Sequence, residues 1–123
     1  MRVNIINGNR GNKTMKKTLL IDLDGVLNNY SKYEENFIPE IKFGAREFLE
    51  NLSKKYEIKI FTTRNRLLAS KWLVENQIDN LVTDVTNVKV PAYLHIDDRC
   101  ICFNGDFKQT LEDIKNFNVY WKN

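Results

Sequence analysis

Short apolar runs alternate with stretches of helical periodicity from Met15 onward. The runs that predict strands lie at residues 18–23, 57–61, 81–85, 92–96 and 101–103, and the first is typical of a buried parallel strand. Apolar positions three or four residues apart predict helices over residues 42–55, 67–77 and 107–117. This alternation predicts an α/β fold: a three-layer, Rossmann-like parallel sheet with helices on both faces.

The remaining segments are polar. Residues 1–14 lack apolar periodicity and the apolar centre of a signal peptide, so we expect a disordered leader or extension before a single domain over residues 15–123. Residues 25–40 are interpreted as a flap. Its aromatic residues Tyr30, Tyr33 and Phe37 either pin the loop to the domain or stack on a substrate ring.

Composition narrows the functional classes. The apolar fraction of 42% is ordinary for a globular protein, and no apolar run is long enough to span a bilayer. We therefore expect a cytoplasmic protein with no membrane partner. A net charge of +3 is too small to favour nucleic-acid binding.

The cysteines and large side chains predict packing rather than chemistry. Cys100 and Cys102 would point to opposite faces of an extended segment, and with His95 they are too few for a structural zinc site. We expect at least one of the two thiols in the core. His95, Trp72 and Trp121 are likewise expected to pack in the core or at its edge.

Polar residues gather where predicted strands end. Asp22 and Asp24 follow the first strand, Thr62 follows the second, Lys89 precedes the fourth, and Asp97 and Asp98 follow it. Because ligands bind beyond the carboxyl ends of open parallel sheets, we expect these residues to converge on one crevice.

Four carboxylates in one crevice would repel one another unless a cation lies between them. Ligands that are all oxygen favour Mg²⁺ over zinc. Mg²⁺ usually retains waters and binds phosphate oxygens. The predicted metal residues are therefore Asp22, Asp24, Asp97 and Asp98, and the predicted substrate carries a phosphoryl group.

The spacing of the first acid pair suits covalent catalysis. Asp22 can attack phosphorus to form an aspartyl-phosphate. Asp24, at the turn, can protonate the leaving group and later accept a proton from water. Thr62 or its neighbour Thr63 can donate a hydrogen bond to the phosphoryl group, and Lys89 can supply positive charge.

The segments LLIDLDGVL, IKIFTTR, NVKVPA and YLHIDDR resemble, in this order, the four motifs of haloacid dehalogenase-like (HAD) phosphatases. The match covers residues 17–104. The resemblance implies that Asp22 is the nucleophile, Asp24 the general acid and base, and Asp97 a direct Mg²⁺ ligand. It also implies that Asp98 ligates the metal or orients a bound water, and that the Asp24 carbonyl is a further ligand. Lys89 lies in a loop where many relatives have a helix, and Lys71 is the alternative.

No cap domain fits between the motifs. The stretch from Leu27 to Lys42 suits a flap but not a domain. We therefore expect an open site that accepts a phosphorylated metabolite, a nucleotide or a macromolecule, or that a second copy of the chain covers. Arg64 and Arg99 could contact the substrate phosphate, but we expect them at a helix end or at the surface, paired with acids.

Two other functions compete with a phosphatase. A receiver-type signalling domain uses similar residues, but its adjacent acid pair comes early and its acceptor Asp ends the third strand, where Asp84 is the nearest candidate. A non-catalytic phosphate-binding or Mg²⁺-binding module is the other. Turnover that requires Mg²⁺ and Asp22 separates both from the phosphatase.

Overall fold

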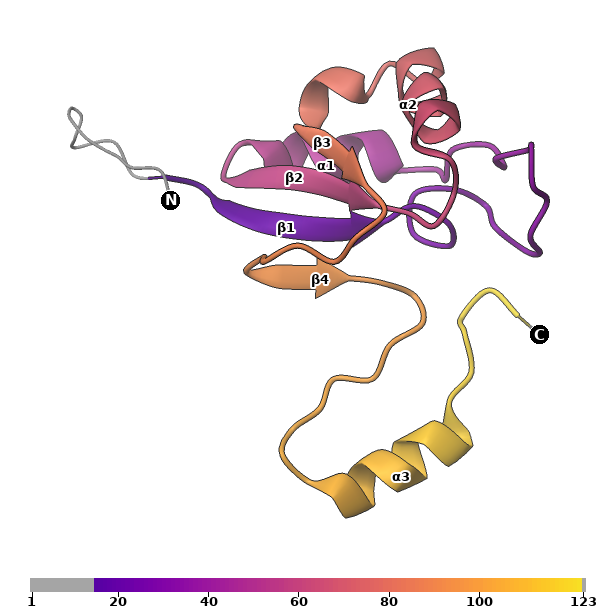
Figure 1. The fold of residues 1–123 in the computed structure, drawn as a ribbon, viewed down its shortest axis with the longest axis vertical. Helices are drawn as coiled ribbons and strands as arrows, with labels where there is room; N and C mark the ends of the chain where they lie inside the picture. The colour runs from indigo at the N-terminus through magenta and orange to yellow at the C-terminus, as the bar shows by residue number, and fades with distance from the viewer. Residues whose placement is uncertain (1–14, 123) are drawn as a thin grey trace.

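One parallel sheet organises the protein, as Figure 1 shows for the computed structural model, which describes residues 15–122. Its strands are β1 (Lys17–Asp22), β2 (Tyr56–Phe61), β3 (Asp84–Thr86) and β4 (Leu94–Ile96). They lie in the order β3-β2-β1-β4. β1 pairs with β2 from Lys17↔Tyr56 to Asp22↔Phe61. It also pairs with β4 up to Ile21↔Ile96. The carboxyl ends of β1, β2 and β4 therefore meet at one edge.

The helices begin where local signals place them. α1 (Ala45–Ser53) follows Gly44, whose φ of 88° few other residues adopt readily. α2 (Arg66–Glu75) is capped by Asn65, whose side-chain oxygen accepts the N–H groups of Leu67 and Leu68. A short 3₁₀ helix, η1 (Asp79–Leu81), and α3 (Phe107–Asn116) complete the described elements.

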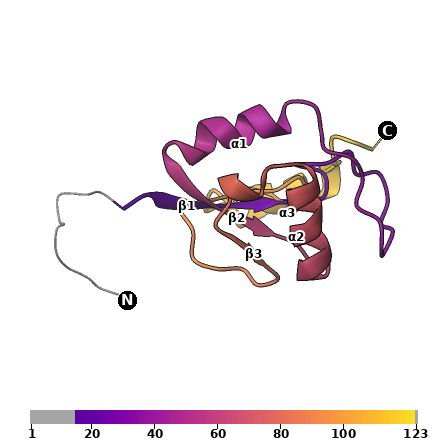
Figure 2. The same ribbon diagram turned by 90° about the horizontal axis from the view of Figure 1, so that it is seen from above.

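A hydrophobic core joins the central strands to the first two helices. Leu19 and Ile21 of β1 lie beside Ile58 and Ile60 of β2, so these four side chains share one face of the sheet, and Leu20 between them is buried on the other face. Leu49 of α1 and the buried residues of α2 (Ala69, Trp72 and Leu73) complete the core. Seen from above, α1 runs along one side of β1 (Figure 2).

The base of the flap is fixed to this core. Asn28 and Ile41 form an isolated antiparallel bridge, and the Lys42 N–H donates to the Leu27 carbonyl. The Trp72 indole N–H donates to the Pro39 carbonyl at 3.0 Å, which confirms that Trp72 packs into the core and shows what it holds there. The two ends of the flap are thereby tied to each other and to α2.

The predicted α/β architecture is confirmed: a parallel, Rossmann-like sheet with helices around it and no cap domain among residues 15–122. The third strand was predicted three residues too early, because η1 takes up residues 79–81. The predicted strand at residues 101–103 is wrong, since that segment pairs with no described strand. Among residues 15–122, no helix is long and apolar enough to cross a membrane. The predicted leader, residues 1–14, lies outside the described residues.

The carboxyl-terminal part of the chain differs most from the prediction. α3 lies beyond β4, away from the rest of the sheet (Figure 1), and its apolar residues Phe107, Leu111 and Ile114 are exposed. The expectation of a buried thiol is wrong: Cys100 and Cys102 are both free and exposed, because residues 97–106 leave the sheet edge instead of continuing it. His95 is also exposed, because β4 is an edge strand.

Candidate active site

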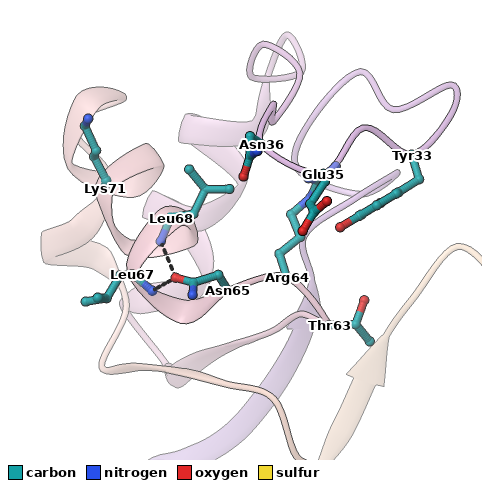
Figure 3. Close-up of a pocket in the computed structure, with 9 residues that line it drawn as sticks. All are labelled: Tyr33, Glu35, Asn36, Thr63, Arg64, Asn65, Leu67, Leu68 and Lys71. Atoms are coloured by element: carbon teal, nitrogen blue, oxygen red, sulfur yellow. Dashed lines mark hydrogen bonds between the residues drawn. The ribbon is translucent and has the colours of Figure 1, made fainter.

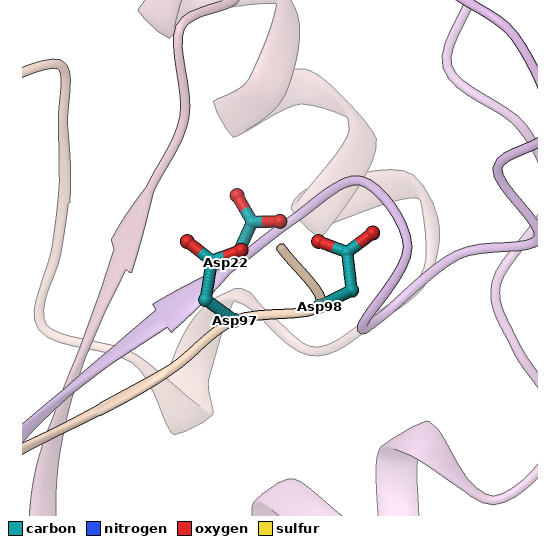
Figure 4. Close-up of side chains that lie close together, drawn as sticks. All are labelled: Asp22, Asp97 and Asp98. Carbon is teal, nitrogen blue, oxygen red and sulfur yellow. The ribbon is translucent and has the colours of Figure 1, made fainter. Parts of the chain in front are cut away.

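Three aspartates meet at the carboxyl edge of the sheet. Asp22 is the last residue of β1, and Asp97 and Asp98 directly follow β4. Ile21 pairs with Ile96, so the residues that follow them, Asp22 and Asp97, lie side by side. One carboxylate oxygen from each of the three aspartates lies within 4.8 Å of the other two. Figure 4 shows the three side chains gathered at this edge.

The charges of this cluster oppose one another. Burial, then the charge of Asp97, then a hydrogen bond and charge from Asp98 raise the pKa of Asp22 to about 8. Burial is also the main cause that raises the pKa of Asp97. The two ion pairs found among residues 15–122 involve none of the three aspartates. An all-oxygen cluster without a countercharge fits a hard divalent cation such as Mg²⁺.

Asp24 stands apart from the three clustered carboxylates. Its Oδ2 accepts a hydrogen bond from Arg64 Nε at 2.7 Å, and its Oδ1 accepts one from Asn28 Nδ2 at 3.0 Å. Arg64 lies next to Asn65, the N-cap of α2, and pairs with an acid, as expected for a helix end, but its side chain is only 1% exposed. Arg64 reaches this position because it follows Thr62 and Thr63 in the loop that leaves β2.

The phosphate-binding candidates differ in how firmly they are held. Thr62 is buried; its N–H donates to the Thr86 carbonyl, and its hydroxyl oxygen accepts from the Arg64 N–H. Thr63 is exposed next to it. Lys89 is exposed, and its ammonium group has no hydrogen bond or ion pair among the described residues. Asn87 fixes the segment before Lys89 by donating to the Thr62 and Arg64 carbonyls.

A segment that sequence reasoning did not connect to the site lies against it. We call residues 119–122 the C-terminal strap. The Trp121 indole N–H donates to Asp98 Oδ2 at 2.5 Å, and the Tyr120 hydroxyl donates to the Gly25 carbonyl at 2.6 Å. The ring of Tyr30 in the flap meets the Trp121 ring edge-on at 5.0 Å. Trp121 is therefore more than edge packing, since it holds one of the clustered carboxylates.

Gly25 makes the approach of the strap possible. Its φ is +86°, and a Cβ there would overlap the Asp98 carboxylate and lie 2.9 Å from Trp121 Nε1. A side chain at this position would push Asp98 and the strap apart. Trp and Tyr near a chain end give no periodic signal, so only the three-dimensional contacts reveal this role.

The family model described as NLI interacting factor-like phosphatase matches residues 17–117. The chain belongs to this phosphatase family. Its fold is HAD-like, as the motif order predicted. A solved structure of a conserved protein from Bacteroides thetaiotaomicron is similar in fold, with a TM-score of 0.55 and 22% identity over 82% of this chain and 91% of that chain. Among curated proteins, none matches this chain.

The protein also has a pocket of about 530 Å³ (Figure 3), and none of the three clustered aspartates lines it. Its walls come from the flap, the loop after β2, and α2. Arg64 and Thr63 line it together with Tyr33 and Glu35 of the flap and Lys71 of α2. Arg64 therefore connects this pocket to Asp24.

Proposed function

We propose that this chain is a Mg²⁺-dependent phosphomonoesterase that forms an aspartyl-phosphate on Asp22 and uses Asp24 as general acid and base. The observation that carries the proposal is the cluster of Asp22, Asp97 and Asp98, with carboxylate oxygens within 4.8 Å of one another and no basic partner among residues 15–122. Membership of a phosphatase family supports the same chemistry.

The four aspartates have distinct roles in the proposed reaction. Asp22, Asp97 and Asp98 would hold the cation, with Asp24 as the further ligand of the predicted set. Bound Mg²⁺ neutralises negative charge on the phosphoryl group and on the carboxylates. An oxygen of Asp22 attacks phosphorus while the bond to the leaving oxygen breaks, and Asp24 gives that oxygen a proton. Water then attacks the aspartyl-phosphate, Asp24 accepts its proton, and phosphate and free Asp22 are regenerated.

The remaining candidates bind the transferred group. The Thr62 hydroxyl still has its proton to donate, because its oxygen serves as acceptor for the Arg64 N–H. Thr63 and Lys89 are exposed near the same loop and would contact the outer phosphoryl oxygens. We infer a cytoplasmic phosphorylated metabolite, nucleotide or macromolecule as substrate; a second copy of the chain over the site remains part of this proposal.

A turnover assay tests the proposal. Wild-type protein with Mg²⁺ should release p-nitrophenol from p-nitrophenyl phosphate at a steady rate, and chelation should stop release. Asp22→Asn should lose at least about a thousandfold in kcat, as expected when a covalent nucleophile is removed. Asp84→Asn is the matched control: Asp84 is exposed at the start of β3 and should not affect the rate.

The intermediate has its own signature. Borohydride reduction of a quenched reaction should convert the phosphorylated aspartate to homoserine at position 22, detectable by peptide mass spectrometry. A receiver-type or non-catalytic domain would bind Mg²⁺ without steady turnover. Labelling at Asp84, or no turnover on any phosphate ester, would refute the phosphatase assignment.

A further inference from the structure

Arg64 is the one charged residue that is buried among residues 15–122. Burying a guanidinium is costly unless it is paired and hydrogen-bonded, so a buried arginine needs a specific reason. Arg64 donates hydrogen bonds to both Thr62 and Asp24: its backbone N–H to the Thr62 hydroxyl and its side chain to the Asp24 carboxylate. Its position is thus linked to two residues of the proposed reaction.

The three nitrogens of the guanidinium have different surroundings. Nε donates to Asp24 Oδ2, and Nη1 donates to the Glu34 carbonyl of the flap at 2.9 Å. The Tyr33 ring lies 5.0 Å from the guanidinium carbon. Nη2 is buried and has no hydrogen-bond partner among the described residues. One planar group therefore joins the acid at one end to the flap at the other.

This geometry controls where Asp24 points. Each carboxylate oxygen of Asp24 accepts one hydrogen bond, Oδ2 from Arg64 and Oδ1 from Asn28. These two hydrogen bonds fix the orientation of the Asp24 carboxylate. Orientation matters because Asp24 can protonate a leaving group only when one of its oxygens is within hydrogen-bond reach of that group. Nη2 of Arg64 is buried and has no hydrogen-bond acceptor among the described residues. Buried donors without an acceptor are rare, so this one indicates that the guanidinium makes a further contact in another state of the site.

We propose that Arg64 is the positioning residue for Asp24 and couples its orientation to the flap, so that a leaving group seated in the pocket beneath the flap adjusts both together. This inference rests on the proposed phosphatase function. It differs from a purely structural role for Arg64, which would affect all substrates equally. Tyr33 lines the 530 Å³ pocket together with Arg64, so a leaving group bound there would meet the exposed Tyr33 ring that faces the buried guanidinium.

Leaving-group dependence tests the proposal. A good leaving group such as p-nitrophenol needs little protonation, whereas an alkyl alcohol needs it fully. Arg64→Gln and Arg64→Lys should therefore lose about tenfold more kcat on an alkyl phosphate than on p-nitrophenyl phosphate, within the range that general acids contribute. Asp24→Asn should show the same pattern. In the double variant Asp24→Asn with Arg64→Gln, the second change should cost less than about twofold, because a positioning residue has nothing left to position.

Arg46→Gln is the matched control. Arg46 likewise donates two hydrogen bonds, but to the carbonyls of Asn76 and Gln77 and not to an acid, so its variant should keep the leaving-group ratio of the wild type. Should Arg64→Gln not fold, Tyr33→Leu serves instead, because Tyr33 is 56% exposed and contacts the same guanidinium; it should shift the ratio in the same direction.

The outcomes separate the two proposals. Wild type without turnover on either ester overturns the phosphatase function itself. Wild type that turns over, with Asp22→Asn inactive but Arg64 variants reduced equally on both esters, overturns only the positioning role. Additive losses in the double variant would do the same.

Discussion

Replacing Asp22 by Asn should abolish activity and yet stabilise the metal-free protein. In the folded state the pKa of Asp22 is raised from 3.8 to about 8 by burial and by the neighbouring carboxylates. The folded protein therefore binds a proton that the unfolded chain has already lost at neutral pH. The contribution of this group to stability is fully present below pH 3.8 and is lost as pH rises toward about 8.

The size of the effect follows from the pKa shift. Each unit corresponds to about 1.4 kcal/mol, so the ceiling at pH 7 is about 4 kcal/mol. Asp22 is only part-buried, and water screens its neighbours, so we reduce this to about 2 kcal/mol. Asn keeps the shape and removes the charge. For a domain of this size the metal-free Asp22→Asn protein should melt about 8 °C above wild type at pH 7.

Thermal unfolding in EDTA, monitored by circular dichroism from pH 4 to pH 8, measures this difference. The advantage of Asp22→Asn should be small at pH 4 and grow steadily with pH. With saturating Mg²⁺ it should shrink or reverse, because the cation needs the carboxylate. The electrostatic reasoning would be refuted if Asp22→Asn melted below wild type at pH 7, or if its melting temperature differed from that of wild type by the same amount at every pH.

Three further predictions follow from neighbouring features. Mg²⁺ affinity should rise from pH 6 to about 8 and then level off, because Asp22 must lose its proton; calorimetry in buffers of different ionisation enthalpy should detect proton release, and a flat profile contradicts this. Trp121→Phe keeps an aromatic ring but removes the hydrogen bond to Asp98, so Mg²⁺ activation should weaken by about tenfold, as when other residues that hold a metal ligand are replaced; unchanged activation would show that the strap is passive. Asn65→Ala should cost about 1 kcal/mol in urea unfolding, because α2 loses its cap, and no loss would mean that water replaces it.

The sequence was a good guide wherever a pattern repeats or ends abruptly. The apolar run before Asp22 and the run before Asp97 marked β1 and β4, and parallel-sheet geometry then brought Asp22, Asp97 and Asp98 together. The prediction that Asp24 shares their metal site stays a prediction, since its side chain turns to Arg64 and Asn28.

Sequence failed where the deciding contact is far away in the chain. Arginine is rarely buried, so nothing around Arg64 signalled that it would be enclosed beneath the flap. The segment at residues 101–103 has the residues of a strand, but a strand needs a neighbour, and the chain leaves the sheet edge there. Trp121 touches Asp98 across a separation that no local pattern encodes.

The strap has a consequence for biosynthesis. The Tyr120 hydroxyl and the Gly25 carbonyl are 95 positions apart, so a chain made from its amino end forms this contact only after all four strands have been made. Until residues 119–122 have left the ribosome, the sheet can assemble but Asp98 lacks its indole partner. Translation thus completes the surroundings of Asp98 after the scaffold that carries it.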